Sequence, residues 1–357
     1  MTHTDTRISL RRTASVVAAG VGLLAALAAF AYNPEQDRVN NAPVPTHWQN
    51  NTVQWNLNPT AGSNVSTAGG PSVQQTLTNA FNTWQKAQLT LNGQPTTVDH
   101  LTVTLGQVSG SLPKAPTVDC LNVVGFADPA KSDFPTGTIA FTSITTTTPP
   151  PNPPIPFDCN PPSPLAGQNC NLDSCLTDAD IEFNPSQMFS TASSPPANAF
   201  SIQGIATHEI GHLLGLDHSG LANAVMYPFG DTGQTVQTVL SIDDAAGIAF
   251  LYPASNFASL TGIVSGTVTL GGSGAFAAHV VVVDASSGDV VSDTLTSTDG
   301  TYQLQGLLPG TYNLLVLPLA GVYDVTNFSG WSCGYAGDPA TCTDIPTNPT
   351  NYTGRFH

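Results

Sequence analysis

Residues 208–219 read HEIGHLLGLDHS, and three of the chain's eight histidines lie within this stretch. On a helix, His208 and His212 are four residues apart, slightly more than one turn, so both imidazoles project from one face. Gly215 then allows a sharp turn that a residue with a side chain resists, so the chain can swing back and bring in His218. The spacing therefore predicts three nitrogen ligands for one metal ion.

Glu209 is rotated by about 100° from His208 on such a helix, which keeps it out of the ligand set but beside the ion. Three protein ligands with an open fourth position are typical of a catalytic zinc site, where zinc lowers the pKa of bound water to about 7. The alternative is a core helix that carries histidines by accident, but five fixed positions recur by chance in about one such sequence in ten thousand. We therefore expect one catalytic Zn²⁺, with Glu209 as the general base that takes the proton of the water.

The extended motif, HExxHxxGxxH followed by Ser219, resembles the signature of the metzincin zinc proteases and, among them, of the matrixin (matrix-metalloproteinase-like) branch. Residues 224–228 (AVMYP) resemble the Met-turn of that branch, and residues 240–253 (LSIDDAAGIAFLYP) resemble its closing helix. The resemblance implies a zinc endopeptidase that acts on proteins or peptides. It also implies that the site is supported structurally by Gly215, Met226, Asp243 and Asp244, with one of the two aspartates bracing the Met-turn.

The resemblance covers roughly residues 42–253 and implies an α+β fold, in which a twisted, mainly parallel sheet with an antiparallel edge strand is combined with three helices. The apolar spacing in residues 71–88 predicts the first helix. Ser201 and Gly215 are the expected start and stop of the motif helix, and the third helix is expected after Ser241. Strand-like runs are HLTVTLG (100–106), NVVGFAD (122–128), GTIAFTSITT (137–146) and ADIEF (179–183). The third run resembles the edge strand along which substrates of the family lie extended.

After residue 253 the chain alternates between apolar and polar residues, with Ser-Gly, Asp-Gly and Pro-Gly turns, which predicts a small all-β sandwich. Residues 262–318 resemble the carboxypeptidase regulatory-like, prealbumin-type domain. We expect a zinc protease domain at 32–256 with a proline-rich insertion at 145–168, a β-sandwich at 257–321 and a C-terminal extension at 322–357. Because the alternating pattern implies a separate core, we expect the sandwich to be an accessory module that folds independently.

Residues 1–31 have the features of a secretory signal peptide. Three arginines precede an apolar run at 16–29, and Ala29, Phe30 and Ala31 form a small-x-small cleavage site. The apolar run is short for a membrane anchor, and no stop-transfer charges follow it. We therefore expect an exported, extracellular protein without a stable membrane anchor, which resembles bacterial matrixin-like proteases that lack a long propeptide. The sequence leaves Sec and Tat export both open.

The charge of the chain excludes several classes of partner. Removal of residues 1–31 leaves 5 basic and 23 acidic residues, a net charge of −18. Such a surface repels phosphate backbones and anionic lipids, so we expect neither nucleic-acid nor membrane partners. The expected state is a monomer.

All six cysteines follow the signal segment, and an even number in an exported chain indicates disulfides. Cys333 and Cys342 are expected to pair near the C-terminus. The other four allow three pairings, among which the sequence does not choose: Cys120, Cys159, Cys170 and Cys175. Because no cysteine precedes Cys120, the thiol latch of matrixin precursors is missing.

Residues outside the motif offer few ligands for further metal ions. Only His47 and His100 are available for the second, structural zinc of the animal enzymes, so we expect that zinc to be absent. Calcium is an unassigned possibility, since five aspartates could supply oxygen ligands, although a solvated acidic surface is the alternative for each: Asp128, Asp133, Asp173, Asp178 and Asp180.

Two other functions remain open at the level of sequence. The chain could be a catalytically inactive extracellular binding or adhesion protein that uses its β-sandwich, although an intact Glu209 disfavours this. It could also be a zinc hydrolase with a non-protein substrate, which the motif disfavours. Substrate specificity, the control of latency and a ligand for the sandwich are not determined by the sequence.

Overall fold

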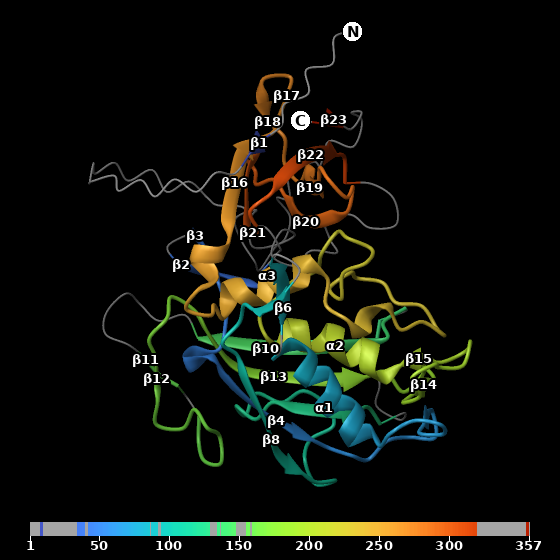
Figure 1. Cartoon of the computed structure of the whole chain (residues 1–357). Coiled ribbons are helices and arrows are strands. Elements are labelled where there is room, and N and C mark those ends of the chain that lie inside the picture. Colours follow the sequence, from blue (N-terminus) through green and yellow to red (C-terminus); the bar gives the residue numbers. More distant parts are fainter. Residues whose placement is uncertain are drawn as a thin grey trace.

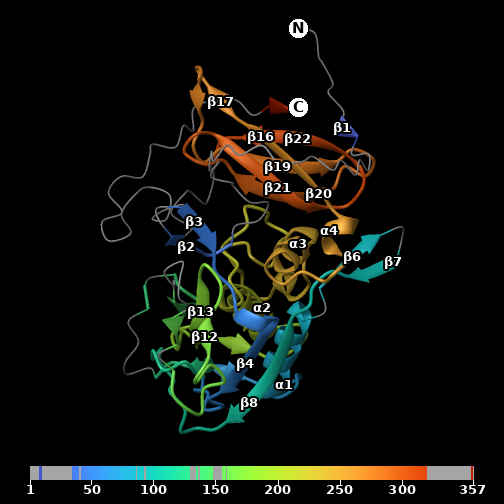
Figure 2. The same ribbon diagram turned by 90° about the vertical axis from the view of Figure 1, so that its left-hand side faces the viewer.

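A computed structural model describes residues 8–9, 34–39, 42–85, 87–91, 94–128, 134–135, 137–147, 155–157, 159–319 and 355–356. The predicted signal segment apart from residues 8–9, part of the proline-rich segment, Asp133 and the predicted Cys333–Cys342 pair lie outside these residues. Figures 1 and 2 show an α/β unit (residues 36–253) and a C-terminal β unit (residues 262–317 together with the short strands at 8–9 and 355–356). The two units meet at α3 (Ile242–Leu251) and α4 (Phe257–Leu260).

A five-stranded sheet forms the base of the α/β unit. In spatial order its strands are β10 (Ala140–Thr147), β13 (Cys175–Phe183), β9 (Val123–Phe126), β4 (Thr52–Leu57) and β8 (Thr102–Val108). The edge strand β10 is antiparallel to β13, and the other pairs are parallel. This agrees with the mainly parallel sheet and antiparallel edge strand predicted from the sequence.

The interior strand β4, between β9 and β8, is not among the runs that the pattern predicts. Its sequence, TVQWNL, mixes apolar residues with amide side chains, which weakens the strand signal. In the structure Asn56 is buried, donates to the Asn122 carbonyl at 3.2 Å and accepts from the Gln107 backbone N–H at 2.8 Å. Tertiary hydrogen bonds therefore satisfy Asn56, whose polar side chain weakens the strand pattern in the sequence.

Three helices have the expected order. They are α1 (Val73–Trp84), α2 (Ile202–Leu213) and α3. Helices α2 and α3 begin at the expected serines, whereas α1 is capped by Ser72 and not opened by Pro71. The N-caps are Ser72, Ser201 and Ser241, and each serine oxygen accepts a hydrogen bond from the backbone N–H three residues on. At α3 the contact is a full capping box, because Asp244 also accepts from the backbone N–H of Ser241.

Helices α1 and α2 pack against each other, and α2 packs against β10 and β13 of the sheet (Figure 1). Phe81 of α1 stacks on Trp55 of β4, with ring centroids 4.3 Å apart. Trp84 is fully buried, and its indole N–H donates to the Thr207 carbonyl of α2 at 2.7 Å. Each of these rings contributes a large buried apolar area, and the indole is also satisfied. The helix that carries the histidines is thereby held from its buried side.

Short elements complete the α/β unit. A small parallel sheet consists of β5 (Val65–Ser66), β14 (Phe189–Ser190) and β15 (Phe200–Ser201), and two 3₁₀ turns are η1 (Gln49–Asn51) and η2 (Val236–Thr238). The antiparallel pairs are β2 (Gln36–Val39) with β3 (Ala42–Pro45), β6 (Gln88–Leu91) with β7 (Gln94–Thr97), and β11 (Ile155–Pro156) with β12 (Asn169–Cys170).

The C-terminal β unit consists of antiparallel strands, as the alternating pattern predicts. In it β19 (His279–Asp284) pairs with β20 (Val290–Leu295) and β22 (Thr311–Leu317), and β16 (Gly262–Thr267) pairs with β21 (Thr301–Leu307). The hairpin of β17 (Thr269–Leu270) and β18 (Ser273–Gly274) and the short strands β1 (Ile8–Ser9) and β23 (Arg355–Phe356), both paired with β22, complete it. The first residues of the predicted sandwich segment form α4 instead of a strand.

Two disulfides resolve the pairing that the sequence left open. Cys120 is bonded to Cys159, and Cys170 to Cys175. The first joins the loop before β9 to the segment that follows β11, and the second joins β12 to the start of β13. Among the described residues, no helix is long and apolar enough to cross a membrane.

Candidate active site and metal centre

The three motif histidines converge at one point. One ring nitrogen of each of His208, His212 and His218 lies within 4.8 Å of the others, and this is the group of potential metal ligands found within the described part of the chain. His208 and His212 project from the last two turns of α2, and His218 comes from the loop that follows. The spacing of four and six residues thus produces the cluster that the sequence predicts.

The hydrogen bonds of the two helical histidines fix which ring nitrogen is free. The Nδ1 atom of His208 lies 2.7 Å from the Val225 carbonyl, and that of His212 lies 2.8 Å from the Leu216 carbonyl. A carbonyl oxygen only accepts, so each Nδ1 carries the proton and each Nε2 presents a lone pair. Burial also lowers the pKa of His208 to about 3 and that of His212 well below its ordinary value, which keeps both rings neutral.

The distance between the two Nε2 atoms shows whether these residues fit a zinc ion. The two Nε2 atoms are 3.2 Å apart, and because both are acceptors they do not hydrogen-bond to each other. Two nitrogens on one tetrahedral zinc, each 2.0–2.1 Å from it, are about 3.3 Å apart. Facing lone pairs at this separation are unfavourable without a cation between them, so the donor set fits zinc.

The turn that returns His218 depends on a glycine. Gly215 has a φ of +96°, a left-handed value that L-residues with side chains rarely adopt. A Cβ atom there would lie 2.2 Å from the carbonyl oxygen of Thr46. The Gly215 carbonyl also accepts a hydrogen bond from the backbone N–H of Glu35 at 2.8 Å. Both the backbone angle and the close contact therefore require glycine here.

Met226 lies against the helix beneath the histidines. A Cβ atom added at Gly211 of α2 would lie only 2.1 Å from the sulfur of Met226, so the missing side chain makes room for the methionine. Asp244 accepts hydrogen bonds from the backbone N–H groups of Val225 and Met226 at 2.8 and 3.1 Å. Because Val225 in turn holds His208, Asp244 supports a histidine through the turn that contains Met226.

Glu209 is buried and oriented by Thr142 of the edge strand. The Thr142 hydroxyl lies 2.7 Å from the Glu209 carboxylate and 2.9 Å from its backbone carbonyl. Burial raises the pKa of Glu209 to about 7, and the Thr142 contact acts in the opposite direction. The carboxylate is therefore placed beside the histidines and tied to the strand at the edge of the sheet.

A cleft of about 630 Å³ is lined by the three histidines, Glu209 and Thr142. One wall is the segment 137–144, including the first part of β10, and the other is formed by residues after Met226: Tyr227, Pro228, Phe229, Gly230 and Gln237. The outer edge of β10 belongs to no strand pair of the described residues, since β10 pairs with β13 alone. An extended chain in the cleft would thus lie beside an edge strand.

Sequence reasoning missed several residues that shape the site. Thr142 has no motif signal, and Gln237 is placed by the fold, where its amide donates to the carbonyls of Val225 and Tyr227 at 3.0 and 2.9 Å. Glu35 lies 3.7 Å from the Nδ1 atom of His212. None of these contacts could be found from spacing, because each joins segments that are distant in the sequence.

Two of the five aspartates named as possible calcium ligands, Asp178 and Asp180, are buried in the fold. Asp180 accepts from the backbone N–H groups of Thr117 and Val123 at 2.8 and 2.7 Å, and burial raises its pKa to about 7. Burial also raises the pKa of Asp178 to about 6. A protonated or backbone-bound carboxyl is a poor ligand for Ca²⁺, and no calcium site is assigned.

Comparison with known proteins gives this geometry a family context. Residues 157–253, which contain the whole histidine motif and Met226, match the matrixin family of peptidases. The match supports a matrix-metalloproteinase-like metzincin. It ends at Pro253, one residue past the C-cap of α3, so the matrixin match does not extend to the C-terminal β unit.

Curated relatives agree with the matrixin match over short regions. Metalloendoproteinase 2-MMP of Arabidopsis thaliana is 40% identical over 103 residues, which is 29% of this chain and 27% of that protein. Metalloendoproteinase 1 of Glycine max is 48% identical over 59 residues (16% and 19%), and human matrilysin is 53% identical over 47 residues (13% and 18%). The chain thus spans about a quarter or less of the length of these relatives. The similarity supports a zinc metalloendopeptidase.

Proposed function

We propose that this protein is a secreted zinc-dependent endopeptidase in which His208, His212 and His218 hold the metal and Glu209 is the general base. The observation that carries the proposal is the convergence of imidazole nitrogens 3.2 Å apart beside a buried carboxylate, in a cleft of about 630 Å³. The matrixin match over the same residues supports it.

The residues divide the chemistry between them. A zinc ion held by His208, His212 and His218 would supply Lewis acidity for the hydrolysis of a peptide bond. Glu209 would take one proton from the attacking water and pass it to the amine nitrogen as the C–N bond breaks, as expected of a carboxylate with a pKa near neutrality. Thr142 orients the carboxylate, and the Val225 and Leu216 carbonyls hold the imidazoles in the tautomer that offers Nε2.

The cleft favours an extended peptide as the substrate. A peptide that pairs with the outer edge of β10 gains backbone hydrogen bonds without regard to its sequence, as in other cases of strand addition. A smaller cavity of about 230 Å³ opens beside this path and is lined partly by apolar side chains, including Ile205, Phe229 and Val236. We propose that it receives one apolar substrate side chain.

The extracellular location rests on the composition of residues 1–31 and on the two disulfides, which are typical of oxidising compartments. An inactive adhesion protein would need neither an intact Glu209 nor a carboxylate held by Thr142. No observation on the site favours that alternative.

The decisive experiment separates the base from the ligands. Glu209→Gln should keep about one equivalent of zinc but lose peptide hydrolysis by a factor of about 10²–10⁴, the usual contribution of general acid–base catalysis. His212→Ala should lose the metal as well. Zinc is measured by elemental analysis, and cleavage of a proteome-derived peptide library by mass spectrometry, with and without chelator.

Glu182→Gln is the matched control, because Glu182 is also a buried glutamate but lies on β13 outside the cleft lining. It should cleave at the wild-type rate. Normal turnover by Glu209→Gln, or more than one tightly bound zinc ion per wild-type chain, would contradict the proposed mechanism.

A further inference from the structure

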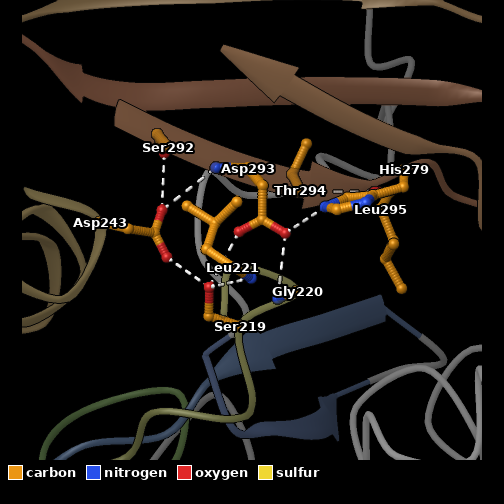
Figure 3. Close-up of polar contacts among 9 residues, drawn as sticks. All are labelled: Ser219, Gly220, Leu221, Asp243, His279, Ser292, Asp293, Thr294 and Leu295. Carbon is orange, nitrogen blue, oxygen red and sulfur yellow. Dashed lines mark hydrogen bonds and ion pairs between the residues drawn. The ribbon is translucent and has the colours of Figure 1, made fainter. Parts of the chain in front are cut away.

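The loop that follows the third histidine is held from outside the α/β unit. Figure 3 shows Ser219 and Gly220 facing Asp293 of β20, with His279 of β19 on the far side of the aspartate. The Ser219 hydroxyl lies 3.0 Å from the Asp293 carboxylate, and the Gly220 backbone N–H donates to the same carboxylate at 3.0 Å. Two consecutive residues after His218 therefore depend on one carboxylate of the C-terminal β unit.

Asp293 is itself fixed in place. Its side chain is 1% exposed, and its second oxygen lies 2.5 Å from the Nε2 atom of His279, which is also buried. Ser292 of the same strand donates to Asp243 of α3 at 2.8 Å, and the Asp293 backbone N–H donates to Asp243 at 3.2 Å. Buried charges of this kind are stable only when each has its partners, so removal of one member leaves the others unsatisfied.

The two sides also fit closely. A Cβ atom on Gly220 would lie 2.6 Å from the Asp293 carboxylate and 2.7 Å from the His279 ring, so only glycine allows this approach. Next to it, Leu221 and Ala224 of the loop form an apolar cluster with Val281 of β19. Apolar side chains therefore surround the hydrogen bonds of this contact and exclude water from them.

The proton count of the network is consistent with its burial. The Ser219 hydroxyl has one proton but lies 2.9 Å from Asp243 and 3.0 Å from Asp293, so it cannot donate to both. Burial, together with the charges of Asp293 and Asp244, raises the pKa of Asp243. The raised pKa of Asp243 favours its protonated form, which has a proton to donate to the Ser219 oxygen.

The network connects to the metal centre over a short distance. Ser219 directly follows His218, and its backbone N–H donates to the Met226 carbonyl at 2.9 Å. Asp243 is the neighbour of Asp244, which holds the turn before Met226. A displacement of the 219–221 segment would thus be transmitted to the third ligand and to the methionine beneath the site.

We propose that Asp293, held by His279, is a positioning residue for the candidate zinc site, and that the C-terminal β unit completes this site rather than being attached to it as a separate module. The inference rests on the proposed function, since it assigns a role relative to the zinc that His218 binds. It adds to the site two residues that lie outside the region matched by the matrixin family.

The test compares three single variants of the full-length chain. Asp293→Ala removes all acceptors and should weaken zinc binding by about tenfold or more, the usual range for residues that orient a ligand. Asp293→Asn keeps an acceptor for Gly220 and a donor for Ser219, so it should restore most of the affinity. Asp289→Ala removes an exposed carboxylate from the turn between β19 and β20 and is the matched control.

Zinc affinity is measured by competition with a chelator, well below the unfolding temperature of each variant. The visible absorption spectrum of the Co²⁺-substituted protein reports the ligand geometry independently of activity, and it should change in Asp293→Ala but not in Asp289→Ala. If Asp293→Ala does not fold, Ser219→Ala carries the test, because it removes the hydrogen bond between Ser219 and Asp293 without altering the β unit. It should also weaken zinc binding and change the spectrum.

Folded Asp293→Ala and Ser219→Ala proteins with wild-type zinc affinity and a wild-type Co²⁺ spectrum would overturn the inference. A wild-type chain that binds zinc and cleaves peptides in that experiment leaves the proposed function intact. A wild-type chain that binds no zinc would instead contradict the proposed function, so the two failures are distinguishable.

Discussion

Single residues at the site are restricted by contacts rather than by chemistry alone. Gly211 is a helix residue between His208 and His212, and a side chain there would meet both Met226 and Trp84, with a Cβ atom 3.0 Å from the Trp84 ring. In an interior packed at this density, one added methyl group displaces the neighbouring side chains. Gly211 and Gly215 are therefore structural requirements of the candidate metal centre, although neither supplies a ligand atom.

Asp99 provides a residue-scale prediction of pH dependence. It is 5% exposed, one of its oxygens has no hydrogen-bond partner among the described atoms, and burial raises its pKa to about 7. The unfolded chain has the ordinary pKa of 3.8. Between these values the folded state holds the proton more tightly, so this group makes the free energy of unfolding fall as the pH rises from about 4 to about 7.

Asp99→Asn cannot ionise and should therefore become more stable relative to wild type as the pH rises through this range, with no further gain above about pH 8. Urea unfolding followed by tryptophan fluorescence at pH 5, 6, 7 and 8 measures the difference. Asp289→Asn, which neutralises an exposed carboxylate, should show no such trend. A difference between wild type and Asp99→Asn that is constant with pH would contradict the assignment.

Among the elements, α3 is distinctive because two aspartates of its first turn contact different parts of the molecule. Asp244 supports the turn at Val225 and Met226, and Asp243 contacts Ser219 and Ser292. Successive residues on a helix are rotated by about 100°, so neighbouring aspartates reach different partners. One helix terminus thus connects the metal centre to the C-terminal β unit.

The disulfides allow a prediction at the scale of elements. Cys120 and Cys159 are 39 residues apart in the sequence, and Cys170 and Cys175 are 5 apart. If a cross-link acts mainly on the entropy of the unfolded chain, replacing the first pair by alanine should cost about 4 kcal/mol and the second about 2 kcal/mol. Urea unfolding of the two double variants measures this, and an equal or reversed order would contradict the entropic account.

At the scale of the whole molecule, the two units share one core. Ala245, Ala246 and Ala249 of α3 belong to the same buried cluster as Leu304 and Leu307 of β21. Gly306 has a φ of +72°, and a Cβ atom there would lie 2.8 Å from the Cβ of Ala246. An interface of this kind is unlike the polar, loosely packed contact of independent domains.

Because of this interface, a chain without the C-terminal β unit is expected to be less stable and to bind zinc more weakly than the full-length protein. The strand pattern alone predicts that a chain ending between Pro253 and Ala258 folds, binds one zinc ion and cleaves short peptides within about tenfold of the full-length rate. Because truncation exposes the alanines of α3 and removes the partners of Ser219 and Gly220, we now expect a lower unfolding temperature and zinc binding weaker by about tenfold or more. Thermal unfolding and chelator competition measure both, and a truncated chain equal to the full-length protein would contradict this expectation.

Local chemistry explains what could be predicted without the structure. The caps of α2 and α3, the glycine at the turn and the three converging histidines follow from the spacing and identity of residues close in the sequence, and the antiparallel edge strand follows from the resemblance to the matrixins. The interior strand β4 was not predicted, because its polar residue Asn56 is satisfied by Asn122 and Gln107, which are far away in the sequence.

The sequence by itself therefore indicated the candidate ligands and the candidate base, because helix periodicity and metal coordination act over a few residues, and its resemblance to the matrixins indicated the class of fold. Only the tertiary structure decided that Thr142 orients Glu209, that Asp244 supports His208 through Val225, and which cysteines pair. It also decided that Asp293 and His279 hold the loop after His218. Hydrogen bonds and close packing between distant segments carry no periodic signal, so they become visible only when the chain has folded.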